Sequence, residues 1–332
     1  MNLDTLIIDA FGQWLEGEVS PERVRRIDLG EPADALWRSL AEHGFADLLL
    51  PEAQGGAAAS AQTACRLLFA AGGAALPLPL ASTWWVRAAL AETGLPLPEG
   101  PIALATGRRE GATLVCRQVP FAASAQWLLA ELPDGAWLLP LASAQRQANG
   151  VYASLAQDLS WPGLPADALR LPAGRDWRAL GAAFSAALIA GAGERVLQLT
   201  LEYANTRQQF GKPIGRFQAI QQQLSVLAEE VFAARMAAQL ALHGASWPAS
   251  VPAAVAKARC SAAAERICAI AHGVLGAIGV TEEYDLQLYT RRLHEWRADY
   301  GSESAWQPLI GRAALDGPGN SLAFLERHLP AA

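Results

Sequence analysis

Apolar positions follow two different periodicities along the chain, and the first is that of a helix. Within the opening hundred residues, i, i+4 spacing links Leu36, Leu40, Gly44 and the run 48–50, which predicts a helix that ends at the next proline. Two further helices are predicted around residues 62–71 and 84–92, because proline or glycine follows each of them closely. The N-terminal part of the chain is therefore expected to be helical.

The periodicity changes between residues 101 and 173, where apolar residues come in short runs. The runs at 112–116, 127–132 and 136–141 are separated by Gly, Pro, Asn and Asp residues. The second and third runs are joined by the turn sequence Pro-Asp-Gly at 133–135. The pattern predicts a small antiparallel sheet that contains this hairpin.

Helical spacing returns at about Trp177 and is strongest between residues 217 and 238. Apolar residues there recur at steps of three and four, which is typical of a long helix packed in a bundle. Further helices are predicted at 252–275, 282–298 and 304–315.

The order helical, sheet, helical predicts an α+β fold that is mainly α. It divides the chain into an N-terminal helical domain at 1–98, a short middle β domain at 99–174 and a C-terminal helical bundle domain at 175–332.

Charge is sparse in this sequence. The 332 residues include 26 basic and 32 acidic ones, 17% in all, against a usual share of about 25%. Because 52% of the residues are apolar, a disordered chain is excluded, and the net charge of −6 argues against general binding to nucleic acid. So few charges predict that another subunit covers part of the surface.

Cysteine spacing and hydropathy argue against two further kinds of protein, metal-binding and membrane-spanning ones. The four cysteines show no CxxC spacing, so we expect reduced core residues and no metal site. The longest uncharged apolar stretch, between Arg178 and Glu194, has 15 residues, fewer than the ~20 that a spanning helix needs. The start of the chain has no signal-peptide pattern. A cytoplasmic protein without a membrane span is expected.

One segment, at residues 203–221, gathers Arg207, Gln209 and Phe210 at a predicted helix–helix corner. Two interpretations are open. Arg207 could satisfy helix-end carbonyls while Phe210 fills the core. Alternatively, Arg207 faces a phosphate and Phe210 flanks a planar ring. The pattern alone favours the structural interpretation.

Three stretches of the chain resemble the acyl-CoA dehydrogenase family. The C-terminal helical signature of that family is similar to RQQFGKPIGRFQAIQ (207–221). Its N-terminal helix and Pro-Glu-x-x-Gly-Gly turn resemble LWRSLAEHGFADLLLPEAQGG (36–56), and its GGxGxTxEYxLxxYxR segment resembles GAIGVTEEYDLQLYTRR (276–292). The resemblance implies an N-terminal helical domain, a middle β domain and a C-terminal four-helix bundle.

The resemblance also implies an oxidoreductase that uses FAD. Such enzymes dehydrogenate an acyl-CoA thioester between its α and β carbons: a carboxylate removes the α proton and the flavin accepts the β hydrogen as hydride. The implied partners are the acyl-CoA substrate, a second acyl-CoA dehydrogenase-like chain and an electron-accepting flavoprotein.

Carried over residue by residue, the resemblance names a set of cofactor contacts. The helix-corner motif implies that Arg207, Gln209, Phe210 and Gln218 contact the FAD held mainly by a neighbouring subunit. The GGxG-like segment adds two further cofactor-binding positions, Gly276 and Ala277.

The sequence departs from the family at the catalytic base. Family members carry a glutamate in a loop near the C-terminus or on the first bundle helix, and here Gly301 and Gly181 occupy those places. Glu303 is the nearest residue that could replace this base. Alternatively, and this is the interpretation that we favour, Glu303 is an acidic residue in the first turn of a helix, where the helix dipole stabilises it. The family's flavin-holding T-x-P-x-x-G-S-D-like segment has no counterpart at 95–175.

The features that would hold this chain's own FAD are missing, while those that would face a neighbour's FAD are present. This combination resembles the short subunits of heteromeric acyl-CoA dehydrogenases that act on steroid side chains. The predicted function is therefore a subunit that completes a shared FAD site with a partner chain, in fatty acid or steroid catabolism. Two alternatives remain open: a self-sufficient homomeric dehydrogenase with a displaced base, and a non-catalytic scaffold of the same fold.

Overall fold

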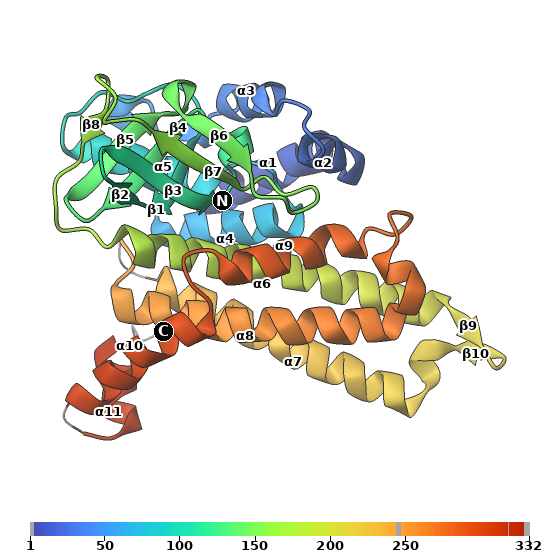
Figure 1. Cartoon of the computed structure of the whole chain (residues 1–332). Helices are drawn as coiled ribbons and strands as arrows, with labels where there is room; N and C mark the ends of the chain where they lie inside the picture. Colours follow the sequence, from blue (N-terminus) through green and yellow to red (C-terminus); the bar gives the residue numbers. More distant parts are fainter. Residues whose placement is uncertain (1–2, 244–246, 318, 329–332) are drawn as a thin grey trace. The chain divides into compact units, whose positions relative to one another are not determined.

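The computed structural model describes residues 3–243, 247–317 and 319–328. They group into two compact units, one made of Met1–Ala64 and Leu76–Gly181 and the other of Cys65–Ala75 and Ala182–Ala332. Along the sequence, helices dominate both ends of the chain and strands β1–β8 come between α5 and α6, as the colours of Figure 1 show. The fold is α+β and mainly helical, as predicted, while the domain limits at 98 and 174 stay predictions.

The first unit begins with a group of helices. They are α1 (Leu3–Glu18), α2 (Pro21–Asp28), α3 (Asp34–Glu42) and α5 (Leu80–Glu92). The start of α2 is fixed because Ser20 accepts a hydrogen bond from the backbone N–H of Arg23 and Pro21 takes the first helical position. Helix α3 ends earlier than its apolar spacing predicts, because Gly44 adopts a φ of 79° and leads into a short 3₁₀ helix.

The strands of the first unit form two sheets. One has the order β1 (Ile102–Thr106), β4 (Trp127–Leu132), β5 (Gly135–Pro140), β8 (Leu169–Arg170). The other has the order β2 (Arg108–Glu110), β3 (Thr113–Val119), β7 (Gln157–Trp161), β6 (Gln145–Ala148). The hairpin predicted at Pro-Asp-Gly is confirmed, with Leu132 opposite Gly135. The prediction of a single antiparallel sheet is wrong, because the described strands of this unit form two sheets and β1 pairs with β4 in parallel.

The second unit is a helical bundle arranged around α8. Its elements are α4 (Ala61–Gly73) from Cys65 on, α6 (Trp177–Thr206) from Ala182 on, β9 (Gln208–Gln209), β10 (Lys212–Pro213), α7 (Gln218–Ala241), α8 (Ser250–Leu275), α9 (Leu286–Ala298), α10 (Glu303–Asp316) and α11 (Ser321–His328). Helix α8 packs against α7, α9 and α10. The predicted helices at the positions of α7, α8, α9 and α10 are confirmed.

Glycines set the close contact between α4 and α6. A Cβ placed on Gly191 would lie 2.0 Å from the carbonyl oxygen of Phe69, and one on Gly72 would lie 2.3 Å from that of Leu188. Only glycine permits this approach, so the small residues of α6 serve helix packing.

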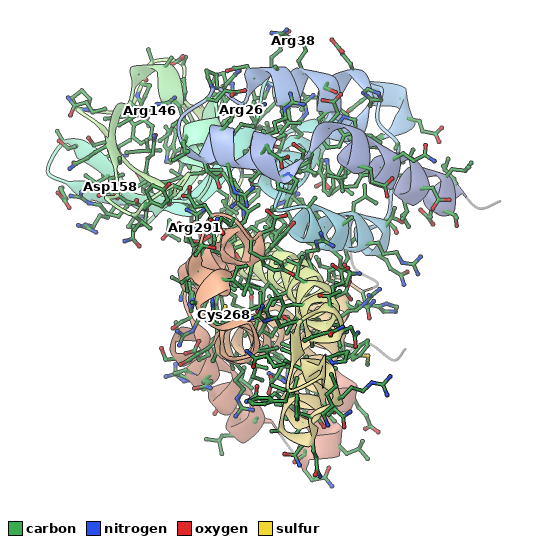
Figure 2. All side chains as sticks on the ribbon, turned by 90° about the vertical axis from the view of Figure 1, so that its right-hand side faces the viewer. Arg26, Arg38, Arg146, Asp158, Cys268 and Arg291 are labelled. Carbon is green, nitrogen blue, oxygen red and sulfur yellow. The ribbon has the colours of Figure 1, made fainter. Side chains whose placement is uncertain are left out.

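The four cysteines are free and buried, in agreement with their predicted place in the core. Cys268 lies among the helices of the second unit (Figure 2). Burial raises the pKa of each thiol to about 12, for Cys65, Cys116, Cys260 and Cys268. At neutral pH these thiols are protonated and unreactive.

Two helices, Trp177–Thr206 and Ser250–Val280, are long and apolar enough to span a bilayer by length and composition. The uncharged stretch in the sequence is thus shorter than the helix that contains it, because charged residues flank it within the same helix. In the most apolar windows, 83% of the first helix and 44% of the second is buried inside the fold. Burial of the extent seen in the first helix is typical of the core helix of a bundle.

Candidate functional site

A two-residue hairpin connects α6 to α7 at one end of the bundle (Figure 1). Strands β9 and β10 pair with Gln209 opposite Lys212, so Phe210 and Gly211 form the turn. Their φ angles are 52° and 80°, and positive values at both central positions are typical of a type I′ turn. The chain thus places a bulky aromatic residue where Asn or Gly is usual.

Phe210 does not fill the core. Its side chain is 91% exposed, and its neighbour is the ring of Phe217, with centroids 6.1 Å apart. A non-glycine residue in the left-handed region costs about 1–3 kcal/mol. The interpretation of Phe210 as a core residue is therefore wrong, and the strained backbone holds its ring out in solvent.

Three polar side chains in and beside the hairpin are also free to contact a ligand. Arg207, Gln209 and Gln218 are exposed, and within the described part of the chain their side chains make no hydrogen bond or ion pair. Arg207 is held by its backbone, which donates to the carbonyl of Tyr203 at 2.8 Å and accepts from the N–H of Ile214 at 2.8 Å. The interpretation of the Arg207 side chain as a helix cap is therefore also wrong.

Gly276 and Ala277 lie exposed in the 3₁₀ helix η6 (Gly276–Val280), directly after α8. The segment that follows η6 is tied to the end of α6, because the Tyr284 hydroxyl donates to the carbonyl of Leu199 at 3.1 Å. The rings of Tyr284 and Tyr203 are also in edge contact, with centroids 6.0 Å apart. The fold thus brings η6 to the same end of the bundle as the hairpin.

Next to η6, His272 has a polar atom without a partner. Its Nε2 is 3.0 Å from the Thr290 hydroxyl, whereas its Nδ1 is buried and makes no hydrogen bond within the residues described. Burial, reinforced by His294, lowers the pKa of His272, so the ring is neutral at pH 7. Sequence reasoning did not single out this residue.

Glu303 is separated from this end of the bundle. It is the first residue of α10, and α9, with 13 residues, spans about 20 Å between η6 and that position. Arg297 donates to both carboxylate oxygens, at 2.5 and 3.1 Å, and this pairing lowers the pKa of Glu303. A carboxylate stabilised as the anion is a weak proton acceptor, which favours the helix-acid interpretation over a catalytic base.

The two family positions for the base carry no side chain. Gly301 has a φ of 103° and follows Tyr300, which has a φ of 57°. The backbone of Gly301 is fixed on both sides, because its N–H donates to the carbonyl of Ala298 at 3.0 Å and its own carbonyl accepts from Trp306 Nε1 at 3.2 Å. Gly181 is buried within α6.

Beneath this loop lies a buried lysine that sequence reasoning missed. Lys257 of α8 has no exposed surface and donates to main-chain carbonyls at the end of α9. The signal was present in the sequence, since a lone lysine stands in the alanine-rich run around 253–264.

Comparisons with known proteins agree with this arrangement. A family model described as acyl-CoA dehydrogenase, C-terminal domain, matches residues 179–303. The chain is 32% identical over 277 residues to acyl-CoA dehydrogenase IpdE2 of Mycobacterium tuberculosis, and the alignment covers 79% of this chain and 80% of that relative.

Solved structures show the same fold. The crystal structure of the ChsE4–ChsE5 complex from Mycobacterium tuberculosis matches with a TM-score of 0.81 at 22% identity, covering 96% of this chain and 99% of that one. A variant of the Tcur3481–Tcur3483 steroid ACAD matches with a TM-score of 0.75 at 24% identity, covering 93% and 96%.

N-terminal helices, a middle pair of sheets and a bundle that carries an Arg-x-x-Phe-Gly hairpin define the acyl-CoA dehydrogenase class of fold. On the sequence identity and coverage above, the chain belongs to the acyl-CoA dehydrogenase family.

Proposed function

We propose that this chain is a subunit of an FAD-dependent acyl-CoA dehydrogenase and completes the flavin site of a partner chain. The observation that carries the proposal is the hairpin, where Phe210 is held out in a strained conformation beside an arginine with no partner in the described chain. A fold that used these residues only for packing would bury the ring and pair the cation.

The side chains at this end of the bundle fit the diphosphate and adenosine part of FAD. The guanidinium of Arg207 can donate two parallel hydrogen bonds to a diphosphate, and the ring of Phe210 can flank a planar base. Gln209 and Gln218 add amide donors and acceptors, and the exposed backbone at Gly276 and Ala277 allows a close approach. When bound, the flavin supplies the hydride acceptor for α,β-dehydrogenation of an acyl-CoA thioester.

The base that removes the α proton is assigned to the partner chain. Glycine at 181 and 301 offers no carboxylate, and Glu303 is committed to its ion pair with Arg297. A heteromer is favoured over a self-sufficient homomer for this reason. The printed names of two similar structures, a complex of two different chains and a steroid ACAD, support a heteromer that acts on a steroid-type acyl-CoA.

The scaffold alternative requires Arg207 and Phe210 to pack within their own chain. Among the described residues, the Arg207 side chain makes no hydrogen bond or ion pair, and Phe210 meets the ring of Phe217 but stays 91% exposed. The remaining partners in the proposal are the acyl-CoA substrate and an electron-accepting flavoprotein, with the assembled enzyme in the cytoplasm.

The decisive experiment measures flavin absorbance of the chain purified alone and after co-expression with the product of a neighbouring acyl-CoA dehydrogenase-like gene. We expect flavin only in the complex. The variant Arg207→Ala should fold normally yet lose most of the bound flavin, because alanine cannot replace a bidentate phosphate contact. Full flavin occupancy in an Arg207→Ala complex of lowered melting temperature would instead show a structural corner.

A further inference from the structure

Lysine is almost never fully buried unless partners satisfy its charge. Lys257 is fully buried on α8 in the second unit. Its ammonium donates to the carbonyl of Trp296, to the carbonyl of Arg297 at 2.9 Å and to the Ser261 hydroxyl at 3.3 Å. All three donor positions of the ammonium are thus used, two of them on the backbone of one short segment.

That segment is the last turn of α9, which ends at Ala298. The final carbonyls of a helix have no partner within the helix, and a cation placed there stabilises them. Lys257 therefore fastens the end of α9 to the middle of α8. A methionine of similar length would fill the same volume with no charge to desolvate, so packing alone gives no reason for a lysine.

The loop that follows α9 is fixed in an unusual shape. Tyr300 and Gly301 both have positive φ, and the backbone of Gly301 is held by Ala298 and Trp306. Across the loop, Arg297 at the end of α9 forms an ion pair with Glu303 at the start of α10 and, at 3.2 Å, with Glu265 on α8.

The charged groups around Lys257 belong to the same network. Asp299 and Glu303 attract its charge and Arg297 opposes it, while burial lowers the pKa of Lys257 and raises that of Asp299. The lysine, the helix end and the loop therefore form one connected unit.

We propose that Lys257 is a positioning residue, which fixes the 299–302 loop in the shape that it takes beside the acyl-CoA substrate in the assembled enzyme. The inference rests on the proposed function, because family resemblance places the reacting region at Gly301. At this position the chain presents backbone and no side chain, so the contribution of the loop depends on its conformation.

The first test uses the chain alone. In Lys257→Met, backbone amide hydrogen exchange at 299–305 should become at least about tenfold faster relative to the amides of α7 and α8, because the anchor of a local opening unit is gone. Lys257→Gln, which keeps an uncharged amide NH₂ as donor, should show a smaller increase. The indole N–H of Trp306, labelled and assigned with Trp306→Phe, reports the same opening through its bond to Gly301.

The matched control is Glu230→Gln. Glu230 is another buried charge of the bundle; it joins α7 to Arg259 and Arg266 of α8 and does not touch the loop. It should lower the melting temperature without selective opening at 299–305. Equal opening in both variants, in proportion to lost global stability, would overturn the proposal.

The second test uses the flavin-loaded complex. Lys257→Met should lower kcat at unchanged flavin content with little change in KM, whereas Glu230→Gln should leave kcat near wild type. Selective loop opening without any loss of kcat would reduce Lys257 to a structural residue and refute the positioning role. Wild-type complex without flavin would refute the proposed function and, with it, the shared site on which the role of Lys257 rests, whatever the exchange result.

Discussion

At the scale of single residues, the clearest conflict between stability and function is at Phe210. The left-handed backbone disfavours a phenylalanine, and the 91% exposed ring gains almost nothing from burial. Asparagine tolerates this conformation, and Asn-Gly is a preferred type I′ turn. A residue that is unfavourable for the isolated chain is expected to act on something outside it.

Phe210→Asn should therefore stabilise the isolated chain by about 0.5–1 kcal/mol while it reduces flavin retention in the complex. Urea unfolding of the chain and flavin absorbance of the complex measure the two effects. Leu315→Gln, at an 86% exposed position on α10, serves as the control for loss of a surface apolar side chain and should leave flavin retention unchanged. Unchanged flavin content in Phe210→Asn would count against the role of the hairpin.

Glu303 gives a prediction with a defined pH dependence. Its pKa lies below the ordinary value of 4.5, first because of the hydrogen bonds from Arg297, so its contribution to stability is complete above that value and is lost as pH falls below it. Glu303→Gln should cost about 1–2 kcal/mol at pH 7 and flatten the loss of stability between about pH 5 and pH 3. Melting temperatures across that range measure it.

The same variant tests the catalytic assignment. Turnover of the Glu303→Gln complex should fall far less than the ~10²–10⁴-fold that loss of a true general base costs, because the lost ion pair with Arg297 disturbs only the start of α10 and the loop before it. A fall of that size at constant flavin content would show that this chain carries its own base.

At the scale of elements, the contact of α4 with α6 depends on the absence of side chains. The carbonyl of Phe69 sits where the Cβ of residue 191 would lie, and backbone cannot yield as the tip of a side chain can. Helix propensity alone would favour alanine at Gly191, so tertiary packing has overruled the local preference.

Gly191→Ala should thus destabilise the chain by about 1–3 kcal/mol through forced separation of the two helices. Gly273→Ala is the matched control, because a Cβ on Gly273 in α8 would meet nothing within 4 Å. That variant should stabilise the chain by about 0.5–1 kcal/mol. Denaturant midpoints of the two variants should move in opposite directions, and a stable Gly191→Ala chain would contradict the packing argument.

At the scale of the whole molecule, α7 carries a surface suited to another subunit. Phe232 and Met236 are 60% and 62% exposed, and of the three charged residues of α7 Glu229 is exposed, Arg235 is half-buried and Glu230 is buried. Interface centres are depleted in charge and enriched in Phe and Met. Together with the low overall charge, this supports the proposed oligomer.

Flavin should therefore stabilise only the assembled protein. At a hundredfold excess over its dissociation constant, FAD should add about 2.7 kcal/mol to the complex and nothing to the isolated chain. Thermal melts with and without FAD, with and without the partner, make the comparison. A monomer at micromolar concentration whose melting is insensitive to FAD even with the partner present would refute an obligate flavin-linked oligomer.

The sequence by itself determined the helices α7 to α10, the β4–β5 hairpin and the family, because periodicity, turn residues and motif spacing are local properties of the chain. It did not single out α1 or α2, and it placed the end of α3 too late. It could not determine the sheet architecture, since the pairing of β1 with β4 joins segments far apart in the sequence. Nor could it decide whether Arg207 and Phe210 pack inward, because exposure depends on the path of the chain before and after the turn. The anchoring by Lys257 was likewise decided only by tertiary structure, because its partners are backbone carbonyls of another helix. Every residue carries a backbone carbonyl, so the sequence does not show which carbonyls accept a hydrogen bond from a lysine.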